Sequence, residues 1–87
     1  MQPKQQPITM IVRLTDGSVH RVRFIPSDED DLQLANRIEK ALQAHDLVLE
    51  LGGRLLVIPK HSIVSIELTP APAKLPAVVI RHARIID

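Results

Sequence analysis

Residues 8–25 of the chain read ITMIVRLTDGSVHRVRFI, two runs of apolar and β-branched residues on either side of Asp16-Gly17. An Asp-Gly pair between two such runs is a strong signal of a β-hairpin, because glycine tolerates the positive φ that tight turns require. We therefore predict antiparallel strands over residues 8–14 and 19–25. This is the first of two hairpins in the predicted fold.

The length of the turn decides which side chains share a face of this hairpin. A two-residue loop would place Met10 and Val12 on the same face as Arg21 and Arg23. A three-residue loop with a glycine bulge shifts the register by one residue and separates the apolar side chains from the basic ones. Register is fixed by what it buries, so we predict the bulged hairpin. Its two faces would then carry Ile8, Met10, Val12, Leu14, Val22 and Phe24 on one side and Thr9, Arg13, Val19, Arg21 and Arg23 on the other.

The pattern of residues 28–45 predicts a helix, the one helix that we expect in the chain. Ser27 suits the N-cap position, and Asp30 can complete an approximate capping box. The acidic run over residues 28–31 is favourable at a helix N-terminus, and it lacks the glycine at the sixth position that a calcium loop demands. At 100° per residue, one core-facing stripe is formed by Leu34, Ala35, Ile38, Ala41, Leu42 and His45.

The second hairpin is predicted over residues 47–58, with Gly52-Gly53 as its turn. The strand around residues 55–58 does not alternate, so we expect both of its faces to be covered. Pro59-Lys60-His61 interrupts the ladder, and residues 62–68 form a further strand. The pattern predicts an α+β fold with two antiparallel β-hairpins flanking one amphipathic helix, β-β-α-β-β(-β), and leaves open a small barrel-like sheet.

The two ends of the chain differ in composition from the predicted domain, residues 8–68. Residues 1–7 are rich in Gln and Pro and are expected to form a disordered leader. Residues 69–87 begin with a Pro-rich arm that favours an extended conformation. The apolar stretch that follows, residues 77–87, is expected to dock on its own sheet or on a neighbouring subunit, as a strand or a short helix.

Length and composition restrict the class of protein. The chain has 87 residues, 45% of them hydrophobic, which is one domain with an aliphatic core, because Phe24 is its sole aromatic residue. So small a core gives limited stability alone, so we expect a homo-oligomer. The chain has no Cys, and it has neither a signal peptide pattern nor an apolar run long enough to span a membrane. We predict a cytoplasmic protein without a membrane partner.

No pattern of residues typical of catalysis is present. The sequence has no Gly-x-Ser-x-Gly elbow, no Cys nucleophile and no glycine-rich phosphate loop, and its four His residues are scattered. We therefore predict no enzymatic activity, no cofactor, no metal site and no small-molecule substrate. Arg13, Arg21 and Arg23 would share the basic hairpin face, which suits RNA phosphates or an acidic protein partner, although a solvated face that prevents edge pairing is the favoured explanation of the charge.

Two segments resemble one known family. Residues 8–19, ITMIVRLTDGSV, resemble the first motif of Sm-like proteins, and residues 57–66, VIPKHSIVSI, resemble the second motif of the bacterial Hfq-like branch. The resemblance implies that Lys60 and His61 help to form the RNA-binding pore of a hexameric ring. The chain departs from the family by a helix between the two motifs and by Pro59 in place of an aromatic residue.

The sequence thus predicts a small non-enzymatic interaction or assembly module that self-associates. A ring-forming, Sm-like RNA-binding protein is the alternative.

Overall fold

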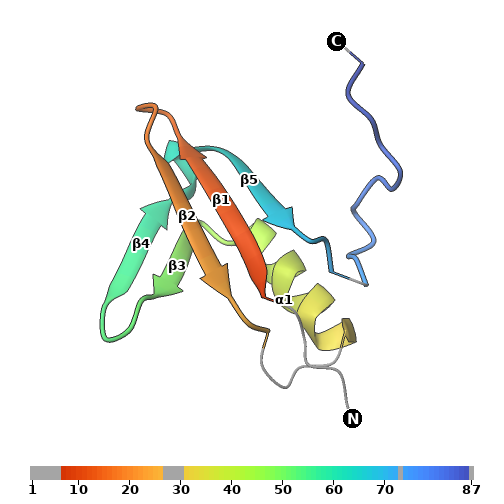
Figure 1. The fold of residues 1–87 in the computed structure, drawn as a ribbon, viewed down its shortest axis with the longest axis horizontal. Helices are drawn as coiled ribbons and strands as arrows, with labels where there is room; N and C mark the ends of the chain where they lie inside the picture. The colour runs from red at the N-terminus through yellow and green to blue at the C-terminus, as the bar shows by residue number, and fades with distance from the viewer. Residues whose placement is uncertain (1–6, 27–30, 73, 87) are drawn as a thin grey trace.

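The computed structural model describes residues 7–26, 31–72 and 74–86, and the side chains within these ranges except those of residues 31 and 32. Figure 1 shows five strands and one α-helix in this part of the chain, with a short 3₁₀ turn before the last strand. The elements are β1 (Ile8–Leu14), β2 (Val19–Phe24), α1 (Asp31–Gln43), β3 (Asp46–Glu50), β4 (Leu55–Pro59), η1 (Lys60–Ser62) and β5 (Ile63–Thr69). The predicted α+β class and order of elements are confirmed.

The first hairpin has the bulged register predicted from its pattern of apolar and basic residues. Met10 lies opposite Val22, and Arg13 lies opposite Val19. The loop is closed by the Leu14 N–H, which donates to the Ser18 carbonyl at 3.0 Å, and by the Gly17 N–H, which donates to the Leu14 carbonyl at 3.0 Å. Gly17 has φ 88°, a conformation that a Cβ atom makes costly.

The strands form two sheets that pack face to face. One sheet has the order β2-β1-β5, with both partners antiparallel to β1, and the other consists of β3 and β4. Between them lies an aliphatic core centred on Met10, Val12 and Ile58. Val12 on the central strand is 0% exposed, so the core is deepest where β1 faces β4.

The sheets do not close into a barrel within the described residues, so the barrel-like sheet left open by the sequence is wrong. After β2 ends at Phe24, the chain forms helix α1 before it returns as β3. The other connection, from β4 to β5, runs through η1, and these two strands do not pair, so the two sheets stay separate.

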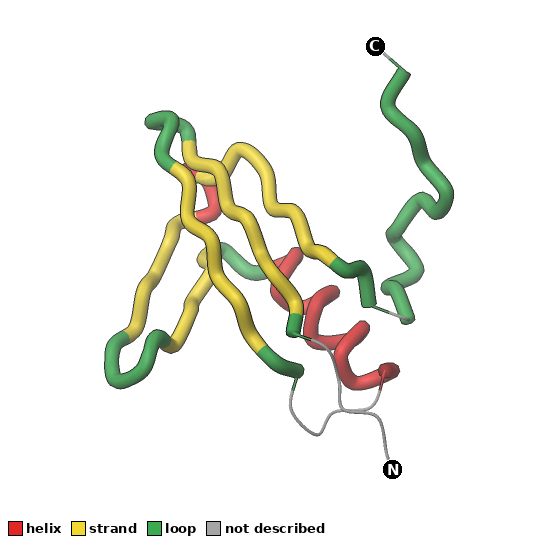
Figure 2. Tube along the Cα trace, in the orientation of Figure 1, coloured by secondary structure: helices red, strands yellow, loops and turns green. Residues whose placement is uncertain are grey.

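Helix α1 ends earlier and is less buried than predicted. The sequence predicted residues 28–45, and the described helix, Asp31–Gln43, ends two residues before that; residues 27–30, with the capping residues Ser27 and Asp30, lie outside the described residues. In Figure 2 the helix runs past the end of the sheet where β1 begins and β5 ends. Leu34 and Ala35 are buried, but Leu42 is 47% exposed, so the predicted stripe faces the core only in the first half of the helix.

The second hairpin is covered on one face only. Its inward side chains (Leu47, Leu49, Leu56 and Ile58) join the core. On the other face Val48 and Val57 pair across the strands and are 54% and 51% exposed, and Leu55 is 68% exposed. The expectation that strand 55–58 is covered on both faces is therefore wrong for the single chain, because no layer of the described structure lies over its outer side.

The C-terminal stretch is only partly held against the domain. Pro76 is buried, and the Val79 N–H donates to the Pro76 carbonyl at 3.1 Å. Residues 80–86 are exposed and form neither strand nor helix, with Ile80 at 84% and Ile85 at 87% exposure. Docking of this stretch on a neighbouring subunit stays a prediction, and of the predicted leader, residues 1–7, the first six residues lie outside the described residues.

Candidate functional site

The basic face predicted for the first hairpin lies on the outer side of the three-stranded sheet. Arg21 lies opposite Ile11 and Arg23 lies opposite Thr9, and both arginines are exposed. They are two residues apart on β2, so their side chains leave the same face of the sheet about 7 Å apart. Neither has an ion-pair partner within the described residues. The two guanidinium groups are thus available to an anionic partner.

Arg13 is placed on the same face but is already paired. Its guanidinium group forms an ion pair and a hydrogen bond with the carboxylate of Glu67 on β5. The side chains are 45% and 53% exposed, so the pair contributes at most about 1 kcal/mol to stability. Its larger effect is on charge: Glu67 offsets Arg13, and the unpaired part of the basic face is reduced to Arg21 and Arg23.

Lys60 is directed at the end of the helix rather than at the basic face. Its ammonium group donates to the backbone carbonyls of Ala41 at 3.4 Å, Leu42 and Ala44 at 3.0 Å. The Lys60 N–H also donates to the His45 carbonyl at 2.9 Å. The last carbonyls of a helix have no partner within it, and a cation there also interacts favourably with the helix dipole. The Lys60 side chain therefore caps the C-terminal end of α1.

His61, the other residue of the Lys-His pair, is exposed on the 3₁₀ turn. The turn is tied to the first hairpin, because the Thr15 N–H donates to the Ser62 carbonyl at 2.9 Å. Arg23 lies toward the opposite end of β2 from this contact. The structure therefore does not bring the five predicted residues into one site: Arg21 and Arg23 share a face, Arg13 is paired, and Lys60 and His61 belong to a separate corner.

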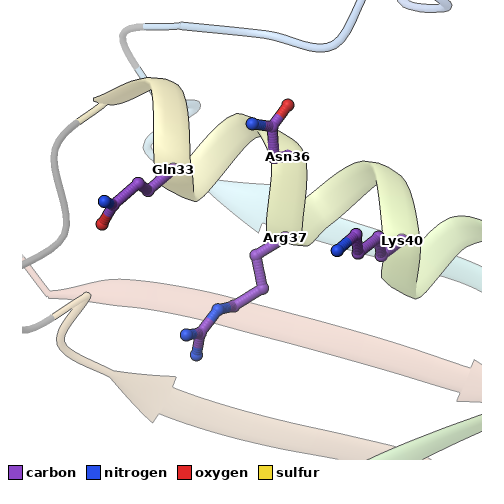
Figure 3. A pocket seen from close by; sticks show the side chains of 4 residues that line it. All are labelled: Gln33, Asn36, Arg37 and Lys40. Carbon is purple, nitrogen blue, oxygen red and sulfur yellow. The ribbon is translucent and has the colours of Figure 1, made fainter.

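A polar hollow along the helix was not predicted from the sequence. Figure 3 shows that it is lined by four side chains of α1, and its volume is about 290 Å³. The lining residues, spaced by three or four positions, are Gln33, Asn36, Arg37 and Lys40. All four lie outside the core-facing stripe predicted for the helix, and their i, i+3/i+4, i+7 spacing was the available signal. Because small-molecule sites are mostly enclosed and apolar, this polar hollow does not resemble one.

Two further observations concern metal binding and membrane-spanning helices in the described residues. They contain no group of three or more His, Asp or Glu side chains arranged to hold a metal ion. No helix among them has both the length and the apolar character that crossing a membrane requires.

Most of the large exposed apolar side chains lie on two surfaces, whereas Val19, Ile25, Leu42 and Val64 lie elsewhere. The first, which we call the outer hairpin face, consists of the outward side chains of β3 and β4, with Val48, Leu55 and Val57 at its centre. The second is the C-terminal segment, residues 77–86, which includes Ile80, Ile85 and Ile86. The sequence identified the segment but missed the face, because the run of apolar residues in β4 was interpreted as a strand buried on both sides.

Comparisons of the chain with models of known protein families, with curated proteins and with solved structures found no match.

Proposed function

We propose that this protein is a non-enzymatic assembly module of the cytoplasm that associates with further copies of itself. The observation that carries the proposal is the exposure of large aliphatic side chains on two surfaces of so small a domain, the outer hairpin face and the C-terminal segment. Isolated apolar side chains are normal on a protein surface, but contiguous ones mark sites of association. Ile80, Ile85 and Ile86 are each more than 80% exposed, so nearly all of their apolar area is available for burial.

The modest core supports the same proposal. Val12 is the one side chain that is fully buried in the described part of the chain. Domains of this size bury a smaller fraction of their unfolded-chain surface than larger domains do, so burial added by association raises their stability. Covering the two apolar surfaces with a second copy would add hydrophobic burial that the single chain does not have.

The test is the mass of the native chain by size-exclusion chromatography with multi-angle light scattering, at loading concentrations from about 1 to 100 µM. Association predicts a mass above that of one chain and a melting temperature that rises with protein concentration, because mass action stabilises an oligomer. A strict monomer whose melting temperature is independent of concentration would overturn the proposal.

A second candidate function is the binding of RNA by a ring of subunits, as the resemblance to Sm-like proteins implies. The exposed, unpaired guanidinium groups of Arg21 and Arg23 favour it. Lys60 does not support it, since its ammonium group is engaged by the helix carbonyls. A hexameric mass would favour the ring.

RNA binding is tested by titration of labelled poly(U) and poly(A) at two salt concentrations. Binding through phosphates must weaken as salt rises, because cations are released from the nucleic acid. Replacing Arg21 and Arg23 together by Gln removes two such contacts per copy, and the slope of log K against log salt should fall by about 1.4 per subunit engaged. A Lys40→Gln/Lys74→Gln variant loses the same charge elsewhere and is the matched control. Absence of binding at low salt would end this candidate.

A further inference from the structure

The outer hairpin face carries charge as well as apolar side chains. Val48 lies on β3 between Asp46 and Glu50, and all three side chains point outward and are exposed. On β4, Pro59 lies opposite Asp46, Val57 lies opposite Val48, and Leu55 lies opposite Glu50. The face is thus an apolar centre with a carboxylate toward each end of one strand.

The C-terminal segment has the complementary composition. Branched aliphatic residues at positions 78–80 and 85–86 flank Arg81 and Arg84, and both arginines are exposed. The two arginines are three residues apart, at most about 10 Å along the chain, and the two carboxylates are four residues apart on β3, about 13 Å. A strand would point Arg81 and Arg84 to opposite faces, but the segment is not a strand and turns at His82, whose φ is 59°, so both arginines can face the hairpin. Their long side chains cover the difference in spacing while Ile80 and Ile85 contact the apolar centre.

The same chain does not place these two surfaces together. In Figure 1 the C-terminal segment rises on the far side of β5, whereas the β3–β4 hairpin projects on the other side of the three-stranded sheet. The buried Pro76 fixes the start of the segment on its own side. The face and the segment of one molecule therefore stand apart, and each is open to a second molecule.

We infer that the C-terminal segment of one copy docks on the outer hairpin face of a second copy, with Arg81 and Arg84 against Asp46 and Glu50. This inference rests on the proposed self-association and names the surfaces that perform it. Each copy has one segment and one face, so two copies can exchange segments in a closed dimer. The hydrophobic contact supplies affinity, and the charges fix the register and orientation of the segment.

The experiment uses two charge-reversed forms of the full chain. The face variant is Asp46→Lys/Glu50→Lys, and the segment variant is Arg81→Glu/Arg84→Glu. Each places like charges against one another in the docked state, so each alone should associate at least about tenfold more weakly than the native chain. An equimolar mixture of the two variants restores opposite charges at both contacts, and its mass by light scattering should return to the native value.

A Lys40→Glu/Lys74→Glu variant changes the net charge as much as the segment variant does, and its mass should stay native. Circular dichroism and the melting curve of each variant show that it is folded, and recovery in the mixture shows it independently. If the native chain associates but neither reversal weakens it, or if mixing restores nothing, this docking is overturned while self-association stands. A native chain that is monomeric throughout overturns the proposed function itself.

Discussion

The ammonium group of Lys60 lies 3.0 Å from the carbonyl oxygen of Ala44 and donates a hydrogen bond to it. The two residues belong to different elements: Ala44 directly follows helix α1, and Lys60 begins the 3₁₀ turn between β4 and β5. This contact, with those to the Ala41 and Leu42 carbonyls, ties the end of the helix to the second sheet. Because the second half of the helix has little apolar burial, such polar contacts carry much of its attachment.

Replacing Lys60 by Met should therefore loosen the helix C-terminus. The change removes the donor and the charge while it keeps most of the aliphatic stem. We expect the free energy of unfolding to fall by about 1 kcal/mol, since the carbonyls of Ala41, Leu42 and Ala44 lose this donor and the favourable charge at the helix end is lost. Urea denaturation followed by circular dichroism at 222 nm measures it. Lys74→Met, a change of the same kind at an exposed position, should leave the midpoint unchanged; equal loss in both variants would contradict the capping role.

Val12 on β1 is expected to be the most sensitive apolar position of the core. It is 0% exposed, and Val12→Ala leaves a cavity between the sheets, so the free energy of unfolding should fall by about 2 kcal/mol. Val64→Ala on β5 is the matched control, because Val64 is 65% exposed and the same truncation there should cost less than about 0.5 kcal/mol. Chemical denaturation measures the loss of unfolding free energy in both variants. Similar losses at the two positions would contradict the central place of Val12 in the core.

Gly17 should resist substitution because of its backbone and not because of crowding. Its φ is 88°, and a Cβ atom added there would meet no other atom within 4 Å. Gly17→Ala is therefore expected to cost about 1 kcal/mol through backbone strain alone, and Gly17→Asn less, since Asn tolerates positive φ better. Thermal melting of the two variants measures the difference. If Ala proves as stable as Gly, the bulged turn does not have this conformation in solution.

The carboxylate of Asp16 should titrate below its ordinary range. The Ser18 hydroxyl donates to it at 2.6 Å and the Ser18 N–H at 2.9 Å, and these hydrogen bonds lower the pKa of Asp16. A carboxylate with a lowered folded pKa contributes stability above its unfolded pKa, and that contribution is lost as the pH falls through the folded pKa. Ser18→Ala removes the hydroxyl, the larger cause, so the Asp16 pKa should rise toward its ordinary value. Carbon NMR of the Asp16 carboxyl group over pH 2–6 follows it, and an unchanged midpoint would contradict the assignment.

Local patterns were sufficient for most of the secondary structure. Asp16-Gly17 and Gly52-Gly53 marked both turns, and the structure has both Gly52 and Gly53 at positive φ. The register of the first hairpin could be predicted from the need to place Met10 and Val22 on one face and the arginines on the other. A slip by one residue would bury arginines in the core. These features depend on residues that are close together in the sequence, so they can be predicted from the sequence alone.

The sites depended on contacts between residues far apart in the chain. Glu67 is 54 residues from Arg13 in the sequence. No local pattern indicated that β5 would pair with β1 and bring Glu67 into contact with Arg13. Lys60 was predicted as one of a Lys-His pair, and its place at the end of α1 follows from how the helix meets the second sheet.

The sequence by itself determined the two hairpins, the register of the first and the single helix, because alternation, helical period and glycine turns act over a few residues. Only the tertiary structure decided which apolar residues stay exposed. The run in β4 is apolar on both sides, and whether its outer side is covered depends on what packs over it. In the single chain nothing described lies there. Burial is a property of the layers above a strand, and for this hairpin we assign that layer to a second copy of the chain.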